Sequence, residues 1–345
     1  MAEPHRRVAV AEHAFRDRLR TFLPVAIGLA ALAVLVLGTD PRAFAWAIAH
    51  FAVGTIPLIV ACAAGALILQ GVRWHFLLRE LAIPVRLRES VLLSVAGQAI
   101  TPILPLGDLT RAIFVTEAKD ANFGQVSATV TVQELTYTLL LVLSAVPALL
   151  QLQQSLAIVA VTVLGVVVIV AILTVPQLFH VVHAAVARTP VLRRFVSVID
   201  ELQHETVELL HRPDTAGWSV LDLARVLVSA TIFYLVVEGL APHSITWWEA
   251  TFVFAVSYVG GAISLIPGGA GATEATTVGA LLLLGVEPGA ATAAALLQRV
   301  FTSGMAALMG FSAYAIARRR YHISGLSALR ARAGSQQRGS ATHAS

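Results

Sequence analysis

Long apolar runs alternate with arginine-rich polar segments along most of this chain. Six of the runs are each close to the roughly 20 residues that a helix needs to cross the hydrocarbon core of a bilayer. Strand-like alternation of polar and apolar residues is absent, so the pattern favours helices over barrel strands. It predicts an all-α polytopic integral membrane protein with about six spanning helices, at residues 22–38, 49–69, 126–150, 156–179, 220–240 and 290–317.

Two further apolar stretches, residues 90–118 and 250–285, are interrupted by proline and glycine, which end helices. An acidic residue follows each interruption, Asp108 in the first stretch and Glu274 in the second. Broken backbone at membrane depth has to line a cavity or pack against protein, and an acid there indicates a functional site. Either acid could instead cap the helix that follows, a role that needs no ligand. The predicted turn residues are Pro105, Gly107, Pro267, Gly268, Gly269 and Gly271.

Arginine positions set the expected orientation, because cytoplasmic segments carry the excess of positive charge. The basic tail at residues 1–21 and the three arginines at residues 318–320 predict that both termini lie in the cytoplasm. The run at residues 22–38 is longer than the apolar core of a usual signal peptide, so we expect an uncleaved first span. The chain is therefore expected to be a multi-pass protein of the plasma membrane.

The same charge rule predicts two re-entrant hairpins. If residues 90–103 crossed the membrane, Arg111 and Lys119 would lie on the outer side. We therefore expect both interrupted stretches to enter the membrane and return, the first from the cytoplasm and the second from the outer face. The two halves, residues 22–150 and 156–317, then form an inverted repeat, an architecture of secondary transporters. The alternative is eight ordinary spans that leave several arginines on the wrong side.

One membrane domain is expected at residues 22–320, followed by a cytoplasmic tail at residues 321–345 that is partly disordered. Between the two halves, helical periodicity at residues 191–210 predicts a surface helix on the cytoplasmic face. Arg225 and Glu238 lie near the ends of a predicted span, so we expect both side chains at the membrane interface.

Composition supports a membrane protein and excludes several function classes. The chain is 57% hydrophobic and 13% charged, whereas soluble domains are about a quarter charged. Its basic pI of about 9.7 comes from arginines beside apolar spans, which suit lipid head groups better than nucleic acid. Cys62 is the single cysteine, so no intrachain disulfide can form. No metal motif, cofactor fingerprint or nucleophile–base pair is found, and we expect no metal, no cofactor and no enzymatic activity.

Charged residues deep in apolar runs are the best candidates for binding. Arg299 lies about ten residues, or roughly 15 Å, into the last predicted helix, too deep to reach water easily. It needs an acidic partner or an anionic ligand; Glu134 and Glu274 are the candidate partners, because one buried charge left without the other is costly. Asp108 and Arg111 are three residues apart and would face the same side of a helix.

These residues resemble the motifs of a known family. Residues 107–111, Gly-Asp-Leu-Thr-Arg, look like its G-[DE]-x-x-R element, and residues 267–274 look like its P-G-G-x-G-x-x-E signature. Glu134 and Arg299 match an acid and an arginine of later helices. The family is the lysylphosphatidylglycerol synthase transmembrane region, or flippase-like domain family, and the resemblance covers about residues 20–320. One departure is Thr138, where the family usually has aspartate.

The resemblance implies a lipid translocase for an anionic or modified phospholipid or glycolipid, as in the lipid-flipping half of multiple peptide resistance factors. It implies that the head group is bound by Asp108, Arg111, Glu134, Glu274 and Arg299. No soluble aminoacyltransferase domain is expected after the membrane region, so lipid lysylation is not expected. The alternatives are a non-transporting subunit that presents lipid to a separate transferase, or a small-solute secondary transporter. The expected partners are membrane lipids, and no nucleic acid.

Overall fold

The computed structural model describes residues 41–99, 107–151, 208, 212–264 and 269–321. Within these ranges every regular element is a helix, which confirms the predicted all-α class. The helices long and apolar enough to cross a membrane are Val53–Glu80, Phe123–Ala148, Asp214–Leu240 and Pro288–Tyr321. Outside the described residues lie the predicted spans at 22–38 and 156–179, the predicted surface helix at 191–210 except for Glu208, both terminal tails, and the turn residues Pro105, Pro267 and Gly268.

The described helices are, in chain order, α2 (Pro41–Ala49), η1 (Val53–Thr55), α3 (Ile56–Glu80), α4 (Leu87–Gly97), η2 (Gly107–Leu109), α5 (Thr110–Lys119), α6 (Phe123–Gln151), α10 (Pro213–Leu240), α11 (Trp247–Ile263), α12 (Ala272–Leu283), α13 (Pro288–Arg299), η5 (Val300–Gly304) and α14 (Met305–Tyr321).

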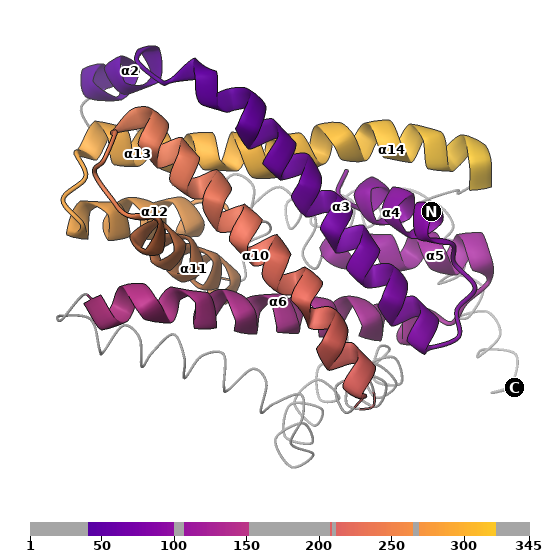
Figure 1. Cartoon of the computed structure of the whole chain (residues 1–345). Helices are drawn as coiled ribbons and strands as arrows, with labels where there is room; N and C mark the ends of the chain where they lie inside the picture. Colours follow the sequence, from indigo (N-terminus) through magenta and orange to yellow (C-terminus); the bar gives the residue numbers. More distant parts are fainter. Residues whose placement is uncertain (1–40, 100–106, 152–207, 209–211, 265–268, 322–345) are drawn as a thin grey trace, which may run out of the picture.

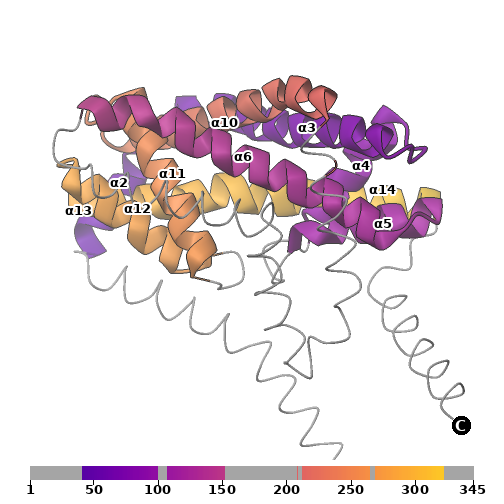
Figure 2. The same cartoon turned by 90° about the horizontal axis from the view of Figure 1, so that it is seen from below.

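Two long antiparallel helices, α3 and α10, pack side by side along one face of the described fold (Figures 1 and 2). At one end of this pair the Ala52 N–H donates to the Gly239 carbonyl at 2.9 Å. At the other end Arg212 Nη1 donates to the Glu80 carbonyl at 2.6 Å. These hydrogen bonds at both ends fix the position of α3 along α10.

Helix α3 is longer than the sequence predicted. The predicted span ends at residue 69, four residues before the first of the basic residues that follow it, Arg73. The structure continues the helix to Glu80 and buries the Arg73 side chain completely. Arg73 Nε donates to Asp222 Oδ2 of α10 at 2.9 Å, and this partner allows a basic residue to continue the helix.

Helices α4 and α5 form a hairpin, named hairpin 1, that returns to the end where it began. At its open end Lys119 Nζ lies 2.8 Å from Glu89 Oε2. At its tip the helices are so close that a Cβ on Gly97 would lie 2.8 Å from the Arg111 Cβ. The helix–break–helix pattern predicted for residues 90–118 is therefore present. At the open end, burial disfavours the charged form of Glu89, but the hydrogen bond and the charge of Lys119 outweigh this effect, so the pKa of Glu89 is lowered.

Helices α11 and α12 form a second hairpin, named hairpin 2, at the opposite end of the α13–α14 rod (Figures 1 and 2). Thr277 Oγ1 donates to Ser257 Oγ at 2.9 Å across its two arms. Gly269 and Gly271 have φ angles of +62° and +83°, in the left-handed region that favours glycine. The turn predicted from these glycines therefore lies where the sequence placed it.

The remaining described helices connect the two hairpins. α6 packs on α10 and α11, and α14 packs on α3 and α4. The last run was predicted as one helix over residues 290–317, and the structure has one continuous helical stretch there, Pro288–Tyr321, with an irregular turn within it. After Arg299 the chain makes the π-helical turn η5 before α14 begins. A π turn within a longer helix frequently marks a functional position.

The tight closure of hairpin 2 predicts that Gly261→Ala is destabilising. The added Cβ would collide with the Thr273 Oγ1 atom, whereas a Cβ on Gly279 would meet nothing within 4 Å. Overpacking of this kind costs about 1–3 kcal/mol. Thermal unfolding in detergent should therefore give a lower Tm for Gly261→Ala and an unchanged or higher Tm for the control Gly279→Ala. Equal Tm values for the two variants would contradict this account of the hairpin.

Candidate functional site

A cluster of polar side chains lies inside the bundle, where α3, α6 and α10 meet hairpin 1. Arg111, in the first turn of α5, donates from Nη2 to Glu134 Oε1 and from Nη1 to Gln133 Oε1, each at 2.9 Å. The Arg111 side chain is fully buried, and its Cζ lies 5.2 Å from the centre of the Trp74 ring. Two hydrogen bonds and an aromatic face thus fix the guanidinium, as expected for arginine in a buried site.

Three glutamines extend the cluster from Glu134 to Asp108. Gln70 Nε2 donates to Glu134 Oε1 at 3.3 Å, and the Gln133 amide donates to the Gln70 carbonyl at 2.9 Å. Gln98, at the end of α4, donates to Gln70 Oε1 at 3.3 Å and to Asp108 Oδ1 at 3.4 Å. These amides satisfy one another, which is required of polar groups inside apolar helices.

Arg225 belongs to the same cluster, so its predicted place at the membrane interface is wrong. Its Nη1 donates to Glu134 Oε1 at 3.4 Å, and its Cζ lies 4.2 Å from the Tyr137 ring. Tyr258 of hairpin 2 makes an edge contact with Tyr137, with 5.6 Å between the centres of the two rings. The prediction failed because α10 begins at Pro213 rather than at residue 220. Arg225 is consequently about 18 Å into the helix.

The two oxygens of Glu134 have different surroundings. Oε1 accepts from three donors, on Gln70, Arg111 and Arg225. Oε2 has no hydrogen-bond partner among the described residues, and 20% of the side chain is exposed. Asp108 likewise accepts only from the Gln98 amide within the described part of the chain. The cluster is therefore balanced in charge but retains carboxylate oxygens that can bind further groups.

A second ion pair, Arg73–Asp222, lies fully buried between α3 and α10. Arg73 Nη2 also donates to the Thr215 carbonyl at 3.1 Å. In the described structure Arg73 Nη1 and Asp222 Oδ1 are buried without a hydrogen-bond partner. This pair thus joins the two central helices but is not open to a ligand, because neither side chain is exposed.

Hairpin 2 carries the third deep ion pair. Glu274, in the first turn of α12 and 2% exposed, forms an ion pair through Oε1 with Arg299 Nε. Its other oxygen accepts from the Gly271 N–H at 2.7 Å. Of the two partners considered for Arg299, the structure selects Glu274. The same carboxylate also caps its helix, which is the ligand-independent role predicted for Glu274.

The structure brings the five predicted head-group residues into two groups. Asp108, Arg111 and Glu134 share the central cluster, and Glu274 and Arg299 form the pair at hairpin 2. The sequence did not identify Gln70, Gln98, Arg225 and Tyr258 as members of the cluster, nor the separate buried pair Arg73–Asp222. Polar residues within apolar helices can identify such positions. The predicted spans 49–69 and 220–240 were too short, so residues such as Gln70 and Arg225 were placed at or beyond their ends rather than inside helices.

The chemistry of the site is that of ion pairing and hydrogen bonding. Guanidinium groups bind phosphate oxygens, and carboxylates bind ammonium or hydroxyl groups. Among the described residues no group of three or more His, Cys, Asp or Glu is placed to hold a metal ion. The arrangement therefore suits a polar or charged ligand that reaches the interior of an apolar bundle.

Comparison with known families gives one match. The sequence model described as "Lysylphosphatidylglycerol synthase TM region" matches residues 21–310 of this chain. That span includes both hairpins and the ion pairs Arg73–Asp222, Arg111–Glu134 and Glu274–Arg299. Among curated proteins none matches the chain.

The buried Arg73–Asp222 pair predicts a specific double-mutant result. Asp222→Leu leaves the Arg73 charge buried without its partner, and breaking a buried pair in this way costs about 3–5 kcal/mol. The double variant Arg73→Met/Asp222→Leu should recover most of the loss, because apolar side chains of similar size replace both charges. Thermal unfolding of the two single variants and the double variant measures the coupling. Additive losses of Tm would show that the two charges do not depend on each other.

Proposed function

This chain belongs to the lysylphosphatidylglycerol synthase TM region family, and from that premise we propose that it is a lipid translocase. It moves an anionic or modified phospholipid or glycolipid between the two leaflets of the plasma membrane. The observation that carries the proposal is the open carboxylate of Glu134 inside an arginine-containing cluster, among helices long enough to cross a membrane. A lipid head group can reach this depth while its acyl chains stay in the bilayer.

An inverted repeat is part of the proposal, with α3, hairpin 1 and α6 matched to α10, hairpin 2 and α13–α14. The packing contacts support this match because they occur in corresponding pairs. α4 packs on α3 and on α14, and its counterpart α11 packs on α10 and on α6. α5 packs on α6, and α12 packs on α13. In this repeat the hairpins are re-entrant, one from each face of the membrane.

The ion pairs follow the same correspondence with their charges exchanged. Glu134 lies eleven residues after the start of α6, and Arg299 lies eleven residues after the start of α13. Each is therefore about 16 Å into its helix. Glu134 pairs with a base in the first turn of hairpin 1's returning helix, Arg111, and Arg299 pairs with an acid in the first turn of hairpin 2's, Glu274. Each half thus has one span–hairpin ion pair.

A head group carrying both charges fits this arrangement. Arg225 and Arg299 keep 16% and 27% of their side chains exposed, so they are the arginines best able to bind the phosphate. Glu134 Oε2 and Asp108 bind the ammonium or hydroxyl groups. Alternating access follows from movement of one half against the other, which brings each hairpin tip toward and away from the site.

The test is transport in proteoliposomes that contain phospholipid labelled in the head group or acyl chain. The purified protein should speed the movement of label from the inner to the outer leaflet, measured by a membrane-impermeant quencher of the label. Both anionic and aminoacylated phospholipids should be used as probes. Unchanged leaflet exchange for every labelled lipid, together with co-purification of a lipid-modifying transferase, would favour a non-transporting subunit.

Glu134→Gln is expected to slow transport, because it replaces the carboxylate that holds three donors and offers Oε2 to the ligand. Loss of one charge-assisted hydrogen bond of about 1.5–3 kcal/mol corresponds to a rate lower by about tenfold or more. Leu143→Ala is the matched control, because Leu143 lies on the same helix with 53% of its surface exposed. Equal rates for the two variants would remove Glu134 from the site.

Arg299→Ala is expected to abolish transport while the protein still folds. Glu274 loses its countercharge but keeps the Gly271 N–H as a donor, so hairpin 2 retains its helix cap. Arg299→Lys should restore part of the rate, because it returns the charge without the geometry of the guanidinium. Size-exclusion elution checks folding, and the proteoliposome assay measures transport. Transport at the wild-type rate in Arg299→Ala would exclude a role in binding the head group.

A further inference from the structure

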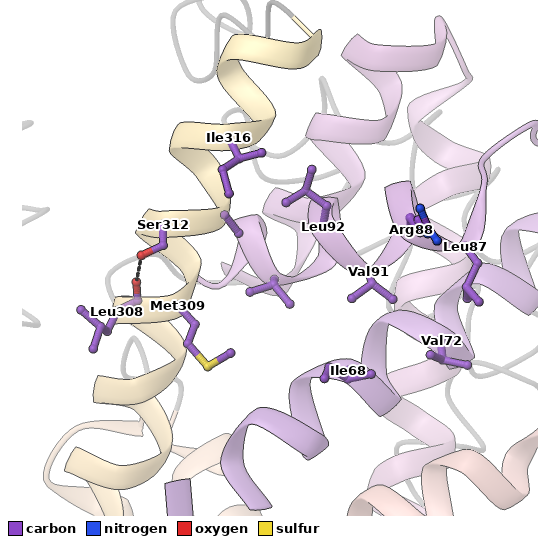
Figure 3. Close-up of a pocket in the computed structure, with 12 residues that line it drawn as sticks. Ile68, Val72, Leu87, Arg88, Val91, Leu92, Leu308, Met309, Ser312 and Ile316 are labelled. Carbon is purple, nitrogen blue, oxygen red and sulfur yellow. Dashed lines mark hydrogen bonds between the residues drawn. The ribbon is translucent and has the colours of Figure 1, made fainter. Parts of the chain in front are cut away.

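An apolar groove of about 740 Å³ lies between α3, α4 and α14 (Figure 3). It shares no residue with the central cluster or with the Glu274–Arg299 pair. Its walls include Ile68 of α3, Leu92 of α4 and Ile316 of α14. The volume falls within the about 300–1,000 Å³ that is usual for small-molecule sites. The groove is thus a separate candidate binding site.

The middle of the groove offers little to a polar ligand. Ser312 is its only uncharged polar lining residue among those described, and the Ser312 hydroxyl already donates to the Leu308 carbonyl at 3.0 Å. The lining positions on α14 run for about 12 Å along the helix, from Leu308 to Ile316. Apart from Ser312, the wall is apolar over this length, which suits a hydrocarbon chain.

One end of the groove is basic. Arg88, in the first turn of α4, is the one charged residue among the described groove residues. Arg319 and Arg320 follow Ile316 by three and four residues, so they continue the same face of α14 and are exposed. Arginines beside an apolar wall fit the two parts of a phospholipid, a phosphate and an acyl chain. The positive-inside rule assigns this end to the cytoplasmic leaflet.

We propose that the groove binds an anionic phospholipid of the cytoplasmic leaflet, with one acyl chain along α14 and the phosphate at Arg88. This lipid is a resident ligand rather than the transported one, because the groove is separate from the central cluster. Its acyl chain fills the space between hairpin 1 and the last helix, which otherwise meet tightly where Gly310 packs on Ala99. It therefore steadies hairpin 1 against α14 from the lipid-facing side.

Native mass spectrometry of the delipidated full chain in detergent tests the site. The probes are dioleoylphosphatidylglycerol and dioleoylphosphatidylcholine, which share acyl chains and differ in charge. The wild-type protein should bind the first lipid at least about tenfold more tightly, the effect expected of a charge-assisted contact. Arg88→Gln should remove that preference. Arg86→Gln should keep it, because Arg86 is exposed nearby but does not line the groove.

A second pair of variants tests the acyl-chain part. Ser312→Trp fills the groove from an exposed position and should lower the affinity for both lipids, whereas Ala315→Trp, also exposed on α14 but outside the groove, should not. Wild-type binding without preference for phosphatidylglycerol, or no effect of Arg88→Gln and Ser312→Trp, would overturn the proposal. If the wild-type protein bound neither lipid, the proposal would also be overturned, and another part of the chain would be the occupant of the groove. Because binding is measured without transport, these outcomes are independent of the translocase proposal.

Discussion

A charge inside a bundle of apolar helices has to meet an opposite charge or a ligand, because water cannot solvate it there. The deep ion pairs of this protein show how far that constraint determines the fold. Arg73–Asp222 joins α3 to α10, Arg111–Glu134 joins hairpin 1 to α6, and Glu274–Arg299 joins hairpin 2 to α13. Each pair links different elements, so the three together fix which helices touch and in what register.

The two hairpins depend on small residues for the same reason that the helices depend on ion pairs. A broken helix in an apolar bundle is tolerated only where its two arms and its turn pack closely against protein. Gly97 lets α4 approach Arg111, and Gly261 lets α11 approach Thr273. The close approach brings the start of each returning helix, with its charged residue, to the interior. Backbone geometry and buried charge are therefore parts of one arrangement.

These ion pairs differ in how much of each side chain stays exposed to a ligand. Arg73–Asp222 is fully enclosed and serves the fold, whereas Glu134 and Arg299 keep part of their surface exposed. If the two halves are an inverted repeat, Glu134 and Arg299 are equivalent positions with opposite charge. A head group with both a phosphate and a cationic or hydroxyl group would then meet a complementary charge from either half. The separate apolar groove between α3, α4 and α14, which has arginines at one end, suits a lipid that stays bound.

The sequence by itself determined the helical membrane class, the two broken stretches with their glycines, and the deep position of Glu134, Glu274 and Arg299. These features follow from local composition, since proline and glycine interrupt apolar helices and a charge within such a helix is costly. The sequence did not determine which acid pairs with Arg299, nor that Arg73 and Arg225 lie inside. Only the tertiary structure decided those points, because a basic residue near a predicted helix end can face lipid head groups or a buried acid. The choice depends on whether another helix brings an acid there.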